Sequence, residues 1–98
     1  MPAPRNEIWY GSDFARDVKK LPSSIQKKLS EFLEILRSDA FDPRLHSKPL
    51  SVPLQGIFTF RITRNYRVAF EFSGPFQIKL LLTDRRNQIY KRLQTKNN

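Results

Sequence analysis

The stretch that decides the fold is residues 57–72, IFTFRITRNYRVAFEF, in which apolar and polar side chains alternate. An alternation with a period of two is typical of β-strands that bury one face. Within residues 55–63 and 66–72, the apolar face carries Phe58, Phe60, Ile62, Val68, Phe70 and Phe72. Between them, Arg64 and Asn65 predict a tight turn, because Asn tolerates a positive φ. We therefore expect an antiparallel β-hairpin here.

A third strand is predicted directly after this hairpin. Ser73-Gly74-Pro75 is a turn sequence. In residues 76–83, Ile78, Leu80 and Leu82 share one predicted face, opposite Lys79, Leu81 and Thr83. The three strands form a predicted antiparallel meander over about residues 55–84. A basic C-terminal segment, residues 85–98, follows it.

Upstream of the meander the apolar period changes to that of a helix. Phe14, Val18 and Leu21 have helical spacing after a predicted N-cap at Ser12, and Pro22 ends this helix. Ser23 and Gln26 have the spacing of a capping box before a second apolar stripe, which contains Ile25, Leu29, Phe32, Leu33 and Leu36. We predict an N-terminal helical hairpin over about residues 12–38, after a short first strand at residues 7–10. Packed on one face of a small antiparallel sheet, it gives an α+β fold.

Length and composition set limits on the class of protein. The 98 residues predict a single domain, residues 1–98, and 39% hydrophobic residues are typical of a globular chain. The absence of Cys and the single His argue against disulfides and a structural zinc site, so no metal or cofactor is expected. No apolar run approaches the roughly 20 residues that cross a bilayer, and no signal peptide is recognisable. We expect a soluble cytoplasmic domain without a membrane partner.

The positive charge is concentrated in the C-terminal half. Eighteen Lys and Arg against nine Asp and Glu give a net charge of +9. Residues 1–54 hold nine basic and seven acidic side chains, whereas residues 55–98 hold nine basic and two acidic ones. Such asymmetry indicates a polyanionic or acidic protein partner. The alternative is a charged, solvated surface that serves solubility.

The second face of the predicted sheet carries the charged residues of the strands. If the apolar face packs on the helices, the opposite face presents Arg61, Arg67, Glu71 and Lys79. Arg85, Arg86, Tyr90, Lys91 and Arg92 follow the last strand. Guanidinium groups match phosphate geometry, and aromatic rings stack on unpaired bases, so this pattern favours RNA binding. The alternative is an ordinary sheet face exposed to water.

Such a face has the groups that RNA cleavage requires. RNA carries its own nucleophile, the 2′-hydroxyl, so cleavage requires in-line geometry, stabilisation of the phosphate charge and proton transfer. Arginines provide the charge stabilisation. Tyr90, Lys48 or a strongly perturbed basic residue are the candidates for proton transfer.

Four segments together resemble the RelE/ParE superfamily of bacterial type II toxins. They are FARDVKKLPSSIQKKLSEFLEIL (14–36), FDPRLHSKPL (41–50), GIFTFRITRNYRVAFEF (56–72) and LLLTDRRNQIYKRL (80–93). The likeness is strongest to the RelE-type messenger-RNA interferases, which cut mRNA in the ribosomal A site and are neutralised by an acidic antitoxin. The resemblance therefore implies a metal-independent, ribosome-dependent mRNA endonuclease that blocks translation.

The resemblance also implies roles for individual residues. Arg67 matches the phosphate-contacting arginine of the family, Arg61 the basic residue of the preceding strand, and Tyr90 the tyrosine that stacks on or activates the nucleotide. Arg86 falls where members carry an arginine or a catalytic histidine. These four are the predicted catalytic residues. The predicted RNA-binding residues are Lys48, Lys79, Arg85, Lys91 and Arg92.

This chain departs from the histidine-based members of the superfamily. They carry His at the positions of Lys48, Arg85 or Arg86, so any cleavage here uses arginine, lysine and tyrosine. Two alternatives stay open: a ParE-like toxin that inhibits DNA gyrase without cleaving RNA, and a basic RNA-binding module without cleavage activity. Either toxin implies an acidic antitoxin partner. The nuclease further implies mRNA and the ribosome, and the ParE-like toxin implies gyrase.

Overall fold

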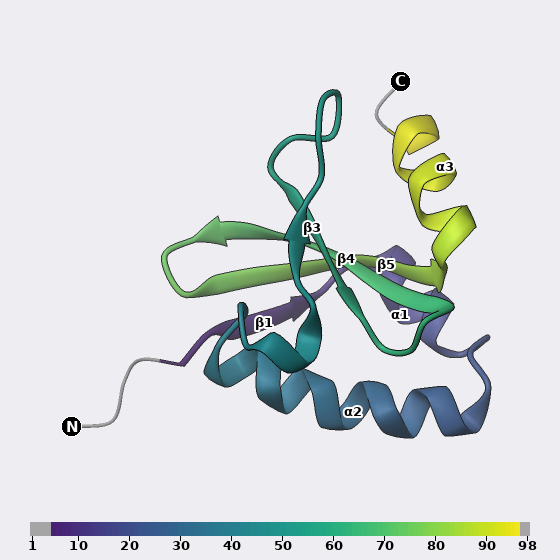
Figure 1. The fold of residues 1–98 in the computed structure, drawn as a ribbon, viewed down its shortest axis with the longest axis horizontal. Helices are drawn as coiled ribbons and strands as arrows, with labels where there is room; N and C mark the ends of the chain where they lie inside the picture. The colour runs from purple at the N-terminus through teal and green to yellow at the C-terminus, as the bar shows by residue number, and fades with distance from the viewer. Residues whose placement is uncertain (1–4, 97–98) are drawn as a thin grey trace.

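The computed structural model describes residues 5–96, which form a five-stranded sheet with three α-helices and one short 3-10 helix (Figure 1). In chain order the elements are β1 (Glu7–Tyr10), α1 (Ser12–Val18), α2 (Ser23–Ser38), the 3-10 helix η1 (Pro43–Leu45), β2 (Lys48–Pro49), β3 (Ile57–Arg61), β4 (Tyr66–Gly74), β5 (Gln77–Arg85) and α3 (Arg86–Lys96). The strand order is β1-β5-β4-β3-β2. The predicted α+β class and the three-stranded meander are confirmed. The last two residues of the predicted basic segment 85–98 lie outside the described residues.

The sheet is mixed, which corrects the prediction of an antiparallel sheet. Strands β2 to β5 pair antiparallel, whereas β1 runs parallel to β5, with Glu7 opposite Gln77 and Tyr10 opposite Leu80. A parallel pair needs a long connection between its strands. Here residues 11–76 lie between β1 and β5, so the sequence of β1 alone does not indicate which strand it pairs with.

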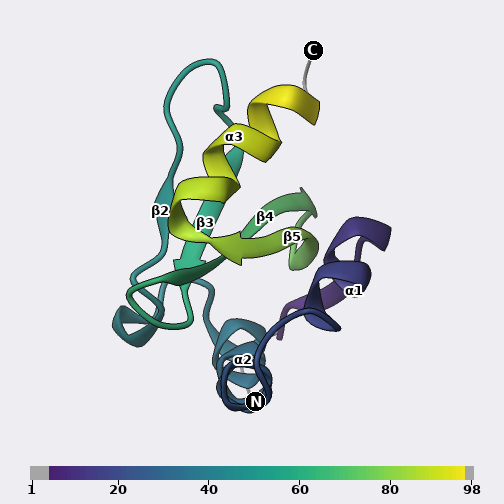
Figure 2. The same cartoon turned by 90° about the vertical axis from the view of Figure 1, so that its right-hand side faces the viewer.

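The two N-terminal helices follow β1, and the predicted N-terminal helical hairpin is not confirmed as such. Helix α1 lies against β5, while α2 runs along the opposite side of the sheet from α3 (Figure 2). Gly11 and Pro22 precede the two helices, and neither helix has a side-chain cap, so the predicted caps are wrong. The Gln26 side chain instead donates a 2.7 Å hydrogen bond to the Val18 carbonyl, which ties α2 to the end of α1.

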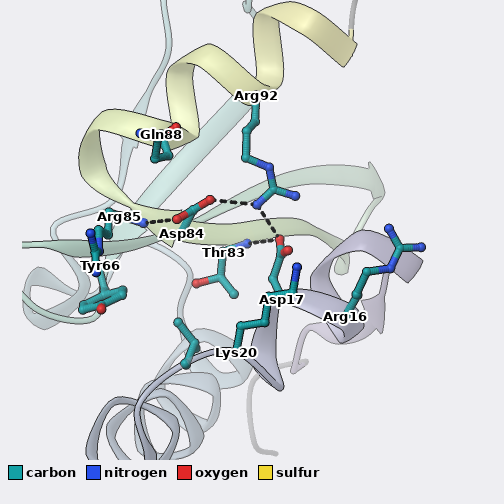
Figure 3. Close-up of a pocket in the computed structure, with 10 residues that line it drawn as sticks. Arg16, Asp17, Lys20, Tyr66, Thr83, Asp84, Arg85, Gln88 and Arg92 are labelled. Carbon is teal, nitrogen blue, oxygen red and sulfur yellow. Dashed lines mark hydrogen bonds and ion pairs between the residues drawn. The ribbon is translucent and has the colours of Figure 1, made fainter.

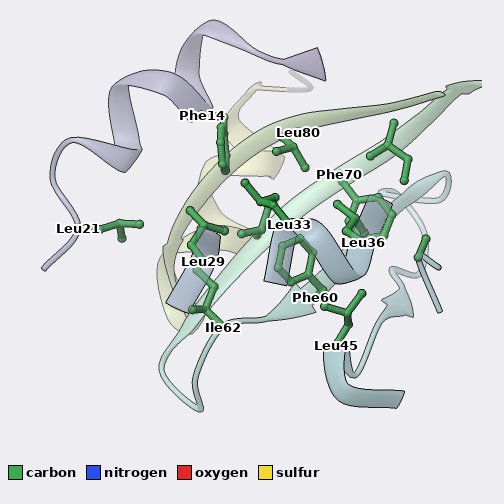
Figure 4. Close-up of a cluster of buried hydrophobic side chains, with 13 residues drawn as sticks. Phe14, Leu21, Leu29, Leu33, Leu36, Leu45, Phe60, Ile62, Phe70 and Leu80 are labelled. Carbon is green, nitrogen blue, oxygen red and sulfur yellow. The ribbon is translucent and has the colours of Figure 1, made fainter. Parts of the chain in front are cut away.

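The main hydrophobic core lies between α1, α2 and one face of the sheet (Figure 4). Phe14 comes from α1, Leu29, Leu33 and Leu36 come from α2, and the sheet contributes Phe60, Val68, Phe70, Ile78 and Leu80. Phe60, Phe70, Ile78 and Leu80 have no exposed surface. This core confirms the predicted apolar face of the first two meander strands.

An irregularity in β5 overturns the predicted face of Leu82. Leu80 pairs with Phe70 and Leu82 pairs with Ala69, so Leu81 is an extra residue in β5. Such a bulge reverses the alternation of the side chains that follow it. Leu82 therefore packs on the opposite face from Ile78 and Leu80.

Helix α3 covers the centre of this opposite face. Its residues Ile89 and Leu93, spaced by one helical turn, pack against Leu54, Ala69 and Leu82 in a second, smaller core. The predicted basic segment is therefore an amphipathic helix over residues 86–96 that buries two apolar side chains. Arg61 at the end of β3 and Arg67 near the start of β4 lie beside the first turns of this helix. No helix among residues 5–96 is long and apolar enough to cross a membrane.

Candidate nucleic-acid interface

Arg61 and Arg67 form the centre of the candidate site. They lie directly opposite each other where β3 and β4 pair, so both side chains project from the face that carries α3. Arg67 is only 5% exposed. A guanidinium in this position stays charged, because no protein environment deprotonates arginine at neutral pH.

These two guanidinium groups lack the partners that buried charges normally have. The Nε atoms of Arg61 and Arg67 are buried without a hydrogen-bond partner, and so is the hydroxyl of Thr59. Among residues 5–96, no carboxylate forms an ion pair with either arginine. A buried donor without a protein partner lowers stability unless a water or a bound anion satisfies it.

The first turns of α3 bring two further predicted residues to this pair. Arg86 and Tyr90 are one helical turn apart and share one side of α3. The backbone N–H of Arg86 donates a 2.7 Å hydrogen bond to the Asn65 carbonyl, which fixes the start of α3 against the β3–β4 turn. The structure therefore brings together all four predicted catalytic residues.

The pKa of Arg67 is shifted by burial and by the other three predicted catalytic residues, which are close enough to interact with it. Burial lowers this pKa, the Tyr90 phenol opposes that effect, and the positive charges of Arg61 and Arg86 lower it further. The balance is a lowered pKa. The surroundings of Arg67 therefore carry excess positive charge, which an anion would neutralise.

Lys48 extends this cluster along the neighbouring strand. It pairs with Thr59, two residues before Arg61, so its exposed side chain lies diagonally beside Arg61 at about 7–8 Å between backbones. Lys48 is therefore at the rim of the Arg61–Arg67 pair. We call Lys48, Arg61, Arg67, Arg86 and Tyr90 the cationic cluster.

Three other predicted RNA-binding residues lie outside the cationic cluster. Arg85 pairs with Tyr66 and lines a pocket to which Lys20 and Arg92 also contribute (Figure 3). Lys79 pairs with Glu71, which is about 13 Å from Arg67 along β4. Lys91 lies over Leu82 on the side of α3 that faces α1.

The fourth, Arg92, is held in an ion-pair network that the sequence did not predict (Figure 3). Its guanidinium lies 2.9 Å from Asp17 of α1 and 3.0 Å from Asp84 of β5. Burial lowers the pKa of Arg92, but the hydrogen bonds to both carboxylates outweigh it and raise the pKa above its ordinary value. Arg92 therefore attaches α3 to α1 and β5.

Sequence reasoning missed two members of this region. Thr59 alternates with the core residues Phe58 and Phe60, and this spacing indicated its face but not its burial. In the sequence, Asp17 is only one of the seven acidic side chains of residues 1–54, yet it is 7% exposed and accepts a hydrogen bond from the Thr83 backbone N–H. His46 is exposed after η1, and no group of three His, Cys, Asp or Glu within residues 5–96 is arranged to hold a metal ion.

The fold recurs in toxin–antitoxin proteins of known structure. A chain of the toxin–antitoxin complex RelBE2 from Mycobacterium tuberculosis is 27% identical, with a TM-score of 0.71, over 86% of this chain and 100% of that one. The RelB–RelE antitoxin–toxin complex from Methanococcus jannaschii gives 22% identity and a TM-score of 0.70 over 86% and 96% of the two chains. A YoeB/ParE toxin from Agrobacterium tumefaciens gives 14% and 0.71 over 82% and 98%. No protein-family model matches the sequence, and no curated protein matches it significantly.

Proposed function

We propose that this chain, a RelE-like toxin of the RelE/ParE superfamily, acts in a type II toxin–antitoxin system by cleaving messenger RNA on the ribosome. The structural likeness supports the toxin class. The cationic cluster supports the reaction, because its charges are arranged for a phosphodiester.

One observation carries the proposal: Arg67 is nearly buried, has no acidic partner within residues 5–96, and interacts electrostatically with Arg61 and Arg86. A surface that serves only solubility would leave its cations exposed and hydrated. The guanidinium groups of Arg61, Arg67 and Arg86 instead provide donors for the two non-bridging oxygens of a phosphodiester, whose negative charge increases in the transition state.

The reaction follows from the chemistry of RNA. The 2′-oxygen attacks the neighbouring phosphorus as its proton is removed, and a bond from 2′-oxygen to phosphorus forms. The bond from phosphorus to the 5′-oxygen breaks, and this oxygen takes up a proton. The products are a 2′,3′-cyclic phosphate and a free 5′-hydroxyl. Arg61, Arg67 and Arg86 stabilise the charge that accumulates on the phosphate between these two steps.

Tyr90 and Lys48 flank the three arginines and are the groups available for proton transfer. Tyr90 is half-buried and interacts electrostatically with Arg67, and its ring has the apolar surface that stacking on a base requires. Lys48 is exposed at the rim, where it contacts the flanking strand of RNA. Positioning by the ribosome supplies the in-line geometry.

An acidic antitoxin is the expected protein partner. The chain has a net charge of +9, and Lys48 and Arg86 of the cationic cluster are exposed. An acidic segment that covers Arg61 and Arg86 would neutralise the surface and block RNA at once.

Mapping of mRNA ends after induction tests the function. Expression of the chain without its antitoxin should arrest growth and create new 5′ ends within translated messages. Arg67→Ala should remove both effects. The matched control is Lys27→Ala, which removes one positive charge from the exposed outer side of α2 and should leave both unchanged.

Two outcomes would contradict parts of the proposal. Growth arrest without new mRNA ends would overturn the nuclease, and inhibition of DNA supercoiling by gyrase would then assign the ParE-like function. RNA binding with neither cleavage nor growth arrest would leave a basic RNA-binding module.

A further inference from the structure

A carboxylate lies next to Arg67 in the sheet and yet does not pair with it. Asp84 of β5 is directly opposite Arg67 of β4, so their side chains project from the same face. Residues in this relation have Cβ atoms about 5 Å apart, and opposite charges there normally attract each other. In this structure Arg67 has no ion pair with Asp84.

Both oxygens of Asp84 are occupied elsewhere. One accepts a 3.0 Å hydrogen bond from the Arg92 guanidinium, and the other accepts a 2.7 Å hydrogen bond from the Arg85 backbone N–H. Figure 3 shows the Asp84 side chain directed along β5 toward Arg92. The carboxylate that could neutralise Arg67 is therefore held by another arginine.

Arg92 is itself anchored on its far side. The same terminal nitrogen that contacts Asp84 lies 2.9 Å from Asp17, whose side chain is only 8% exposed. Asp17 also accepts a 3.2 Å hydrogen bond from the Thr83 backbone N–H. Because Asp17 is fixed by α1 and β5, Arg92 has a defined position from which it holds Asp84.

We propose that Arg92 is a positioning residue that keeps Asp84 away from Arg67, so that the Arg67 guanidinium stays available to the RNA phosphate. This inference depends on the proposed function for the identity of the anion, but not for the contact itself. Without Arg92, Asp84 turns to Arg67 and competes with the phosphate. In this way Arg92 prevents an ion pair between Asp84 and Arg67.

A purely structural role for Arg92 predicts something different. If Arg92 only attached α3 to α1 and β5, its loss would weaken the site by displacing Tyr90 and Arg86, whatever residue stood at position 84. If Arg92 instead holds Asp84, removing the charge at position 84 should restore the RNA affinity that the loss of Arg92 lowered. The two roles therefore separate in a comparison of variants that differ only at position 84.

The variants are Asp17→Asn/Arg92→Ala and the same pair with Asp84→Asn added. Asn at 17 avoids an unpaired buried carboxylate and keeps an oxygen for the Thr83 N–H. Asp84 is 30% exposed, so Asn is accommodated there. The control adds Glu71→Gln instead, which removes one negative charge from the same strand face, away from Arg67.

The first measurement needs no RNA: hydrogen exchange of the Arg67 Nε–H group by NMR. We expect exchange in the double variant to be about tenfold slower than in the triple variant with Asp84→Asn, because a carboxylate then binds this N–H. The control with Glu71→Gln should match the double variant. Equal exchange with and without Asp84 would overturn the proposal.

The second measurement is affinity for ribosomes programmed with an mRNA that carries 2′-O-methyl groups and cannot be cleaved. The double variant should bind about tenfold more weakly than the triple variant, and Glu71→Gln should not restore affinity. Equal affinities would overturn the inference. If α3 detaches in the double variant, Arg92→Gln, which keeps a donor toward Asp17, gives the same comparison.

A different result would contradict the proposed nuclease function itself. If Arg67→Ala in the wild-type background cleaves mRNA normally, the nuclease site is wrong, whatever the exchange of Arg67 shows. If Arg67→Ala abolishes cleavage but Asp84→Asn restores nothing, only the role of Arg92 is wrong.

Discussion

Arg67 and Arg92 lie on the same side of the sheet and are both largely shielded from water, but their surroundings are opposite. Arg92 contacts two carboxylates and has a raised pKa. Arg67 contacts none within residues 5–96, and burial and neighbouring arginines lower its pKa. One arginine is neutralised within the protein, and the other is not.

This difference separates structural charges from functional ones. An arginine between two carboxylates has its hydrogen bonds satisfied and holds elements together. A nearly buried arginine without a carboxylate destabilises the free protein and gains from a bound anion. Total positive charge alone does not distinguish the two. We therefore expect substitutions at Arg67 to affect activity and those at Arg92 to affect stability as well.

The largest expected effect comes from Arg67. Arg67→Ala should lower the rate of mRNA cleavage on the ribosome by about 10³-fold, since it removes a donor to the transition-state charge. Its free energy of unfolding should not fall, because a buried charge without a partner disappears with it. Cleavage kinetics and urea denaturation check both parts. A variant that loses stability and keeps its rate would reverse the assignment of the two arginines.

In contrast to Arg67, Arg92 should contribute to the free energy of unfolding. Arg92→Ala should lower the free energy of unfolding by about 3 kcal/mol, because it leaves the Asp17 carboxylate buried without its cation. Urea denaturation measures this loss. Adding Asp17→Asn should recover part of it. If Arg92→Ala unfolds at the wild-type urea concentration, the bridge contributes nothing to stability.

Variants of Tyr90 distinguish proton transfer from base stacking in the cationic cluster. Tyr90→Phe keeps the ring for stacking and removes the hydroxyl, and should lower the cleavage rate by about 10²-fold if the phenol transfers a proton. Tyr90→Ala removes stacking as well and should lower it further. Single-turnover rates on programmed ribosomes separate the two. A Phe variant with the wild-type rate would limit Tyr90 to stacking.

The smallest expected effect concerns the acid dependence of stability and comes from an exposed ion pair between Arg44 and Asp42. Arg44 donates hydrogen bonds to Asp42 at the start of η1, and these lower the pKa of Asp42 to about 2. Because the folded pKa lies below the unfolded value of 3.8, the stabilisation is present above pH 4 and is lost as the pH falls toward 2. Asp42→Asn should flatten this part of the acid dependence of the urea midpoint. An unchanged pH profile would show that the exposed pair is fully screened.

Much of the fold was predictable from local patterns. The alternation in residues 57–72 predicted two strands and their buried face, and the stripe from Ile25 to Leu36 predicted α2. Helix α3 was not predicted, because among its eleven residues only Ile89 and Leu93 mark an apolar face. The bulge at Leu81 has no sequence signal either, since Leu80, Leu81 and Leu82 are chemically alike.

The candidate site divides in the same way. Arg61 and Arg67 could be assigned to one face because alternation within a hairpin is a local property. Resemblance to a toxin family then singled out Arg86 and Tyr90 among the residues that follow the last predicted strand. Arg92 is an arginine like Arg61, Arg67 and Arg86, so nothing in the sequence marked it as an ion-paired residue. Its partners, Asp17 and Asp84, are 75 and 8 residues away.

The sequence by itself determined the strands, the buried stripes, and the excess of positive charge beside the meander. These depend on periodicity and composition, which neighbouring residues set. Only the tertiary structure decided which of these positive charges are free. Whether an arginine has a carboxylate partner depends on elements that are distant in the chain and meet in space, as α1, β5 and α3 do around Arg92.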